Sequence, residues 1–185
     1  MKITQCRSCN SKKLFNVFSL GKQNLTGIFP ISKKHKISSG NLDLVLCKNC
    51  TLLQLKHSFD INEMYGENYG YMSSLNASMI EHLKKKAKSL IKISKIKTKD
   101  IVIDIGSNDG SFLSFFPKKN ILIGVDPTIK KFKKFYRKDI LKVSDFFSFL
   151  KIKKLIGKKK VKLITSISMF YDLEDPVNFA KDIEK

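Results

Sequence analysis

The feature that most constrains the fold of this 185-residue chain is an apolar segment that ends in a glycine-bracketed turn. Residues 101–105 read IVIDI, the next five residues read GSNDG, and a helix-like segment follows from residue 111. A second apolar segment, 121–125, ends at Asp126. A strand, a tight turn and a helix in this order are typical of a nucleotide-type cofactor site, in which a carboxylate one strand over binds a ribose.

The pattern from residue 99 to residue 185 alternates apolar strands with helices. We expect strands at 101–105, 121–125, 140–143 and 161–167, and helices near 111–116, 128–138 and 146–156. A last helix is expected to begin at Asp175-Pro176, an N-cap followed by proline at the first helical position. Apolar strands separated by helices indicate a parallel sheet with both faces covered, which is an α/β, Rossmann-like fold.

The first part of the chain predicts a different, smaller unit. Residues 1–56 contain all four cysteines and three short segments of strand character, at 15–20, 42–46 and 51–55. Residues 57–98 read as an aromatic connector and a helix from 74 to 93, whose apolar stripe comprises Leu75, Met79, Leu83, Ala87 and Leu90 or Ile91. The predicted domains are therefore 1–56, 57–98 and 99–185.

The cysteines form two C-x-x-C pairs, Cys6 with Cys9 and Cys47 with Cys50. Each such pair makes a turn that points both sulfurs at one point, and two pairs supply the four thiolates of a closed tetrahedral zinc site. Such a site has no open coordination position, so we expect a structural Zn²⁺ that takes no part in catalysis. Two disulfides, or four thiols without a metal, are the alternatives.

The turn itself has the outline D-x-G-x-x-x-G. It lacks the middle glycine of the dinucleotide fingerprint and the Lys-Ser/Thr of a phosphate loop, so a pyrophosphate is a poor ligand for it. S-adenosylmethionine fits better: Asp104 or Asp109 lies near its ammonium group, Gly106 allows close backbone approach, and Asp126 takes the ribose hydroxyls. The predicted cofactor-binding residues are Asp104, Gly106, Ser107, Asn108, Asp109, Gly110, Asp126, Asp145 and Phe146, the last as a stacking partner for adenine. An ordinary strand–turn–helix is the alternative.

Residues 104–113, DIGSNDGSFL, resemble motif I of the class I methyltransferases. More narrowly, the chain resembles the sugar C-methyltransferases that act on nucleotide-linked 4-keto-6-deoxyhexoses. Three further parts carry this resemblance: the paired C-x-x-C module, YGYMSSLNASM at 69–79, and SMFYDLEDP at 168–176. The fold class that the resemblance implies is a small zinc-binding β module followed by a truncated Rossmann-like class I methyltransferase sheet.

The resemblance implies chemistry at a carbon next to a ketone. A base would remove the α proton of the sugar, and the enolate would attack the methyl group of the cofactor. A nucleotide-sugar substrate carries a diphosphate, which suits a lysine-rich rim. The residues that the resemblance places around cofactor or sugar are Tyr69, Tyr71, Ser73 and Asn76, for which a packed connector with a helix cap is the alternative.

The chain departs from the family in its length. Family members are longer, and the resemblance implies a histidine as general base in a C-terminal half that these 185 residues lack. His35, His57 and His82 match no catalytic motif, so the catalytic residues stay unknown. Residues 161–167 would form an unpaired apolar edge, and we expect either a fragment of a longer enzyme or a second chain that completes the sheet.

The net charge of +20 comes almost entirely from lysine, because Arg7 and Arg137 are the only arginines. Arginine is the usual residue for bidentate phosphate and base contacts, so a generic lysine surface is the preferred interpretation and nucleic acid an unexpected partner. A non-enzymatic zinc module that binds RNA or DNA is the alternative function. No apolar run approaches the ~20 residues of a membrane span, and residues 1–6 do not resemble a secretory signal, so we expect a cytoplasmic protein without a membrane partner.

Overall fold

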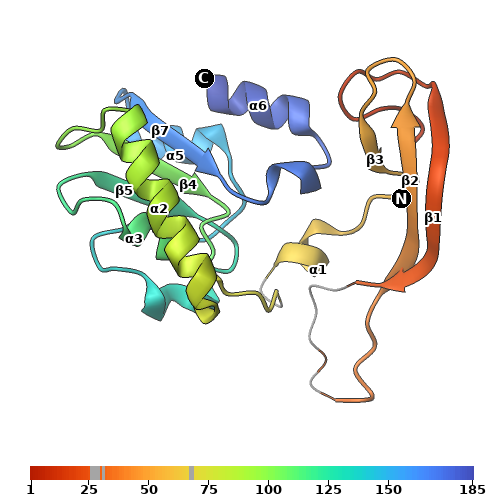
Figure 1. The fold of residues 1–185 in the computed structure, drawn as a ribbon, viewed down its shortest axis with the longest axis horizontal. Coiled ribbons are helices and arrows are strands. Elements are labelled where there is room, and N and C mark those ends of the chain that lie inside the picture. Colours follow the sequence, from red (N-terminus) through yellow and green to blue (C-terminus); the bar gives the residue numbers. More distant parts are fainter. Residues whose placement is uncertain (26–29, 31, 67–68) are drawn as a thin grey trace. The chain divides into compact units, whose positions relative to one another are not determined.

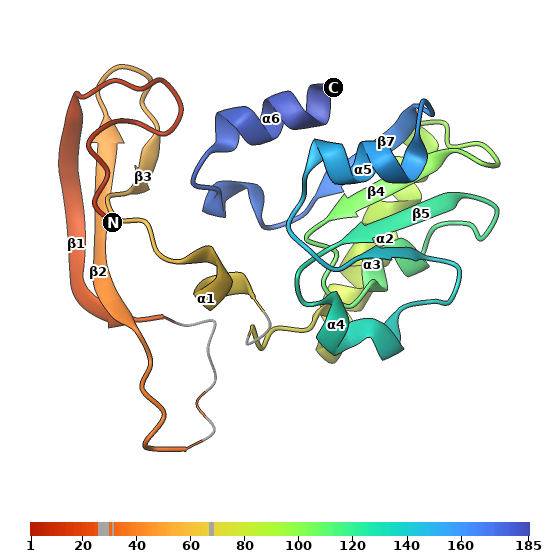
Figure 2. The same cartoon turned by 180° about the vertical axis from the view of Figure 1, so that it is seen from behind.

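The computed structural model describes residues 1–25, 30, 32–66 and 69–185 of the chain. It contains two compact units (Figures 1 and 2). The first comprises Met1–Gly70 together with Asp172–Glu184, and the second comprises Tyr71–Tyr171 with Lys185. The predicted domain limits at residues 56 and 98 stay a prediction.

The first unit contains an antiparallel three-stranded sheet in the order β1-β2-β3 (Figure 1). The strands are β1 (Leu14–Asn24), β2 (Ser39–Cys47) and β3 (Leu53–Leu55). All three fall where alternating apolar residues predicted strands. β1 is longer than expected because two register shifts, between Asn16 and Phe18 and between Ser19 and Lys22, let it follow β2 through a polar stretch.

Two helices belong to the same unit. The helix α6 (Pro176–Glu184) begins as predicted, since the Asp175 carboxylate accepts a hydrogen bond from the Asn178 amide at 3.0 Å. The helix α1 (Ile61–Tyr65) was not expected from the sequence. Asp60 caps α1, but five residues are too few to establish a helical period in the sequence.

The second unit contains a parallel four-stranded sheet in the order β6-β5-β4-β7. Its strands are β4 (Ile101–Ile105), β5 (Ile121–Val125), β6 (Leu141–Val143) and β7 (Val161–Ser166), each within a residue of its predicted limits. Along the chain these are the third, second, first and fourth strands of this sheet, which is the order in a doubly wound Rossmann-like sheet. The predicted α/β fold class is therefore confirmed.

Helices cover both faces of this sheet. The helix α2 (Ala77–Ile93) lies in front of the sheet in Figure 1, and α5 (Phe149–Ile156) lies in front of it in the reverse view of Figure 2. The remaining α-helices are short, α3 (Ser111–Ser114) and α4 (Ile129–Phe132), and the 3₁₀ turns are Ser73–Leu75, Lys133–Phe135 and Phe170–Asp172.

The helices α2 and α5 each begin three residues later than predicted, and two other helices end earlier than predicted, for local reasons. The first, expected at 111–116, ends early because Pro117 disfavours the helical conformation of the residue before it. The second, expected at 128–138, consists of α4 and the 3₁₀ turn Lys133–Phe135, after which Tyr136 takes an extended conformation. Tyr136 is 6% exposed, so its side chain leaves the helix to enter the interior.

A single apolar cluster joins α2 and α3 to the sheet. It contains Leu83, Ala87, Val102, Phe112, Leu113, Phe116, Leu122, Ile129, Tyr136 and Ile140. Burying each large apolar side chain contributes about 1.5–3 kcal/mol, so this cluster fixes α3, and with it the turn before α3, against the sheet. The predicted stripe of α2 is largely correct, but Leu75 is 75% exposed because it lies in the 3₁₀ turn before the helix.

Candidate metal centre and cofactor turn

The two C-x-x-C segments fold into matching turns. The carbonyl of Cys6 accepts a hydrogen bond from the Asn10 amide at 3.0 Å, and the carbonyl of Cys47 accepts one from the Thr51 amide at 2.9 Å. Asn10 and Thr51 both take left-handed backbone conformations, with φ of 57° and 61°. Such a conformation is unusual for a β-branched residue and costs about 1–3 kcal/mol. No glycine marks this position in the sequence.

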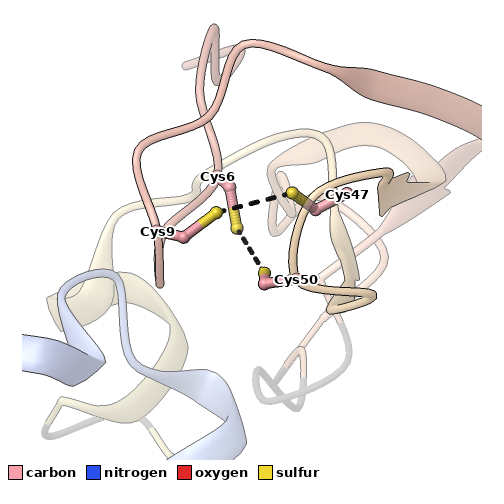
Figure 3. A group of neighbouring side chains, drawn as sticks. All are labelled: Cys6, Cys9, Cys47 and Cys50. Atoms are coloured by element: carbon pink, nitrogen blue, oxygen red, sulfur yellow. Dashed lines mark hydrogen bonds between the residues drawn. The ribbon is translucent and has the colours of Figure 1, made fainter.

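These turns bring all four cysteine sulfurs within 4.8 Å of one another (Figure 3). The Sγ atoms of Cys6 and Cys50 are 3.6 Å apart, as are those of Cys9 and Cys47. Four sulfurs at the usual Zn–S distance of about 2.3 Å in a tetrahedron would lie about 3.8 Å apart. The arrangement therefore fits a structural Zn²⁺, and all four cysteines are free thiols, so the disulfide alternative is not adopted.

The surroundings of the cluster favour the thiolate form of Cys6 and disfavour that of Cys50. Burial alone would raise the pKa of the Cys6 thiol, but backbone amides of Cys9 and Ser8 and the side chain of Gln54 together lower that pKa to about 6. The Gln54 Nε2 donates to Cys6 Sγ at 3.2 Å. The Leu52 amide lowers the pKa of the Cys50 thiol, but burial and the three neighbouring cysteine side chains raise that pKa overall to about 12. A divalent cation would relieve this repulsion, since coordination deprotonates thiols.

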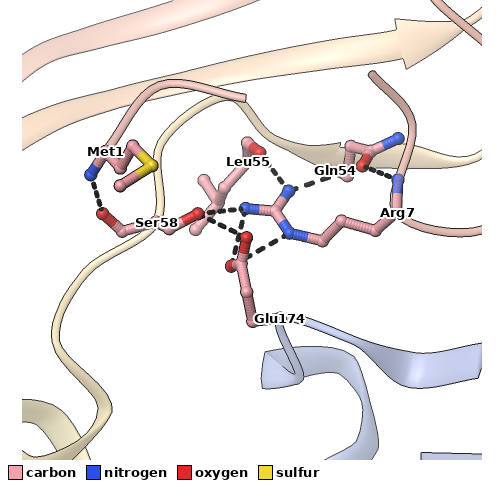
Figure 4. A network of polar contacts seen from close by, with 6 residues as sticks. All are labelled: Met1, Arg7, Gln54, Leu55, Ser58 and Glu174. Atoms are coloured by element: carbon pink, nitrogen blue, oxygen red, sulfur yellow. Dashed lines mark hydrogen bonds and ion pairs between the residues drawn. The ribbon is translucent and has the colours of Figure 1, made fainter. Parts of the chain in front are cut away.

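Arg7 lies between the two cysteines of the first pair, and all three nitrogens of its guanidinium group donate hydrogen bonds (Figure 4). It donates to the Leu55 carbonyl at 2.6 Å and to Ser58 Oγ at 3.1 Å, and it pairs with the Glu174 carboxylate at 3.2 Å. Its backbone amide donates to Gln54 Oε1, the residue that contacts Cys6. The first cysteine pair is thereby connected to the segment Asp172–Glu184 within the first unit.

The glycine turn occupies the carboxyl end of β4. Gly106, Asn108 and Gly110 have φ of 76°, 50° and 77°, which only glycine and asparagine adopt readily. A Cβ on Gly106 would lie 3.1 Å from Met169 Cγ, just after β7. The order of the strands reverses between β4 and β7, and the crevice outside the carboxyl ends of strands at such a point is where doubly wound sheets bind ligands.

Asp126 lies beside the turn, at the end of β5. Its Oδ2 accepts a hydrogen bond from the Asn108 amide at 2.9 Å, and its Oδ1 accepts bonds from the amide and the hydroxyl of Thr128 at 2.7 and 2.5 Å. A carboxylate has about four acceptor positions. The three internal bonds orient Asp126 and leave one position for a hydroxyl group, as the predicted ribose contact requires.

The other two acidic residues of the turn are more deeply buried. Asp104 is 3% exposed and accepts a hydrogen bond from Thr165 Oγ1 at 2.7 Å. Burial raises the pKa of Asp104 to about 7, with a further contribution from the Asp126 carboxylate. Asp109 accepts bonds from the amides of Ser74 and Ser111, at 2.8 and 3.0 Å. Both carboxylates hold backbone or neighbouring side chains in place, and their predicted contact with an ammonium group stays a prediction.

The structure brings part of the aromatic connector to the turn. Asn108 Oδ1 accepts a hydrogen bond from the Ser73 amide at 2.9 Å, and its Nδ2 donates to the Tyr71 carbonyl at 3.0 Å. Asn76 instead caps α2, where its side chain accepts from the Ser78 amide. Tyr69 belongs to the first unit, where its ring packs edge-on against Tyr65 at 5.5 Å between centroids.

Asp145 and Phe146 follow β6, next to the end of β5. The β6 residue Val143 accepts a hydrogen bond from the Asp126 amide at 3.1 Å. The Asp145 side chain pairs with Lys151, which holds the pKa of Asp145 below its usual value, and it accepts a bond from the Phe146 amide at 2.7 Å. The predicted adenine contact of Phe146 stays a prediction.

Sequence reasoning missed three residues that build the turn, Thr165, Met169 and Tyr136. One signal pointed to Tyr136: Gly124 interrupts the apolar strand 121–125, and a glycine inside a strand often marks a close approach by another group. Thr165 and Met169 carried no such signal, because their positions depend on the pairing of β7 with β4.

Comparison with known proteins finds similarity to a zinc-binding family and to a methyltransferase. Residues 6–65, which include all four cysteines, match a family described as "Putative zinc binding domain". The chain is also 29% identical over 130 residues to the C-methyltransferase NovU of Streptomyces niveus, an alignment that covers 68% of this chain. The chain is therefore similar to a C-methyltransferase. It spans 30% of the length of that relative. None of the helices in the described ranges is long and apolar enough to cross a membrane.

Proposed function

We propose that this chain supplies the zinc module and the cofactor turn of an S-adenosylmethionine-dependent C-methyltransferase. The observation that carries the proposal is the turn at the carboxyl end of β4, beside the point where the strand order reverses. The similarity to a C-methyltransferase supports the type of reaction. The zinc ion is assigned a structural role, because four cysteine sulfurs leave it no open position.

In this proposal the cofactor supplies an electrophilic methyl group, and the residues of the turn bind and orient the molecule that carries it. Gly106 and Ser107 present backbone close to the ligand, and Asp126 accepts a ribose hydroxyl. Asn108 holds the segment Tyr71–Ser73 beside the turn through its two amide-group hydrogen bonds. Tyr71 and Ser73 then lie where a second substrate would meet the cofactor.

The proposed second substrate is a nucleotide-linked keto-deoxysugar. The similarity to a C-methyltransferase supports C-methylation, and the charge of +20 favours an anionic diphosphate. No residue is assigned as general base. His35, His57 and His82 all precede the turn in sequence.

We further propose that additional strands pair with β7, supplied by a second chain or by other residues of the same enzyme. Among the described strands β7 pairs with β4 alone and lies at one edge of the sheet. An open edge presents unpaired backbone donors and acceptors to any neighbouring strand. Size-exclusion chromatography with light scattering tests this, and a soluble, cooperatively folded monomer at high concentration would contradict it.

Titration calorimetry with S-adenosylmethionine tests the proposed function directly. The chain should bind one equivalent, and Gly106→Ala should weaken binding at least tenfold, because a side chain at φ 76° is strained and approaches Met169. Gly157→Ala is the matched control, since Gly157 also has a positive φ of 64° but has open space around its Cβ position.

Absence of binding at millimolar cofactor would refute the proposal. If the same protein then bound random RNA with an affinity that falls steeply with salt, the alternative of a zinc module for nucleic acids would replace it.

A further inference from the structure

The side chain of Tyr136 lies against the cofactor turn from the protein interior. Its hydroxyl donates to the Asn108 carbonyl at 2.8 Å, and it is also 2.8 Å from Ser107 Oγ. Since the phenol has one hydrogen and gives it to Asn108, the Ser107 hydroxyl is the donor in the second bond. Burial raises the pKa of Tyr136, so the hydroxyl keeps its proton.

Two glycines make room for this ring. A Cβ on Gly110 would lie 2.7 Å from Tyr136 Cδ1, and a Cβ on Gly124 would lie 2.9 Å from Tyr136 Cε1. Real Cβ atoms do not approach other atoms so closely, and an aromatic ring this buried cannot move aside cheaply. Gly110 and Gly124 thus both leave room for the Tyr136 ring, and Gly124 also leaves room for Ser107, whose Oγ would lie 2.8 Å from a Cβ there.

Tyr136 binds the one residue of the turn 106–110 that has a positive φ without being a glycine. Asn108 has φ of 50°, and its amide and side chain contact Asp126, Ser73 and Tyr71. The hydrogen bond from the buried Tyr136 hydroxyl to its carbonyl favours this backbone conformation over one with a negative φ. A change to a negative φ would break that bond and release all of these contacts together.

We propose that Tyr136 is a positioning residue for the cofactor turn, and that its hydroxyl sets the conformation of Ser107 and Asn108 that binds S-adenosylmethionine. This inference rests on the proposed function. In this proposal Tyr136 does not contact the ligand. It acts through the backbone of Asn108 and the hydroxyl of Ser107. The effect on binding is therefore a cost of ordering the turn.

Tyr136→Phe is the test, because it removes the hydroxyl and keeps the ring. We expect the Kd for S-adenosylmethionine to rise about tenfold, which corresponds to about 1.4 kcal/mol. In the free protein, amide hydrogen exchange should become faster at residues 106–111 and stay unchanged in β4 and β5. Tyr171→Phe is the matched control, since Tyr171 is 77% exposed.

The outcomes separate this inference from the proposed function. A wild-type chain that binds no cofactor refutes the proposed function. A wild-type chain that binds, together with a Tyr136→Phe variant of unchanged Kd, refutes only the positioning role, even if the variant is less stable towards urea. If Tyr136→Phe does not fold, Ser107→Ala removes one of the two bonds and should raise the Kd about threefold; an unchanged Kd would likewise refute the role.

Discussion

Replacing Asp104 by Asn should remove a pH-dependent destabilisation of the second unit. The Asp104 carboxyl is buried at the end of β4, and burial raises its pKa to about 7, against about 3.9 in an unfolded chain. Between these two pKa values the folded state holds a proton that the unfolded state has lost. The stability of the wild-type protein therefore falls as the pH rises through this range.

The size of the effect follows from the two pKa values. They are about three pH units apart, and each unit corresponds to about 1.4 kcal/mol, so the full effect is about 4 kcal/mol. About 3 kcal/mol of it falls between pH 5 and pH 8. Asn resembles the protonated carboxyl in shape and can accept the Thr165 hydrogen bond, so the variant should gain on the wild type as the pH rises.

Urea unfolding followed by circular dichroism at pH 5, 6, 7 and 8 measures this difference. Asp139→Asn is the control, because Arg137 lowers the pKa of the exposed Asp139 carboxyl. That carboxylate stabilises the wild type throughout pH 5–8, so the control variant should be less stable than the wild type by an amount that does not change with pH. Wild type and Asp104→Asn with parallel stability profiles across this range would refute the assignment of a buried, proton-holding Asp104.

Three further predictions concern the first unit. Freshly purified protein should contain one zinc per chain by metal analysis, and less than half an equivalent would contradict the four-cysteine site. Removing the zinc with a chelator should speed amide exchange in residues 1–56 and in α6, because Arg7 connects the cysteine pair to Glu174; unchanged exchange in α6 would contradict that connection. Glu174→Gln should speed exchange in α6 by up to about fivefold, consistent with the 0.2–1 kcal/mol of an exposed ion pair, whereas the control Glu184→Gln should not.

The sequence predicted the centre of the parallel sheet well because its two central strands, β4 and β5, are almost wholly apolar. Ile101–Ile105 is buried along its entire length, and the turn after it carries two glycines with positive φ. Such segments have few alternative structures, so local pattern and tertiary structure agree. The four cysteines were equally clear, because their spacing alone defines two turns.

The parts that sequence reasoning missed depend on contacts between distant residues. The helix expected at 128–138 was cut short because the burial of Tyr136 outweighs its helical propensity. The roles of Asn108 and Asp109 as anchors for the connector could not be read from the motif, because the amides that they bind lie 35 residues away. Thr51 in a left-handed conformation contradicts local preference and follows from its place after the second cysteine pair.

The placement of the two arginines bears on how this chain tolerates change. Arg7 joins four groups of the first unit, and Arg137 donates to the carbonyls of Ser114 and Phe116 while also pairing with Asp139. A lysine ammonium is a single point that cannot span such a fork of acceptors. Exchange of either arginine for lysine would therefore leave some of these acceptors without a donor, so these two positions restrict substitution even by a residue of the same charge.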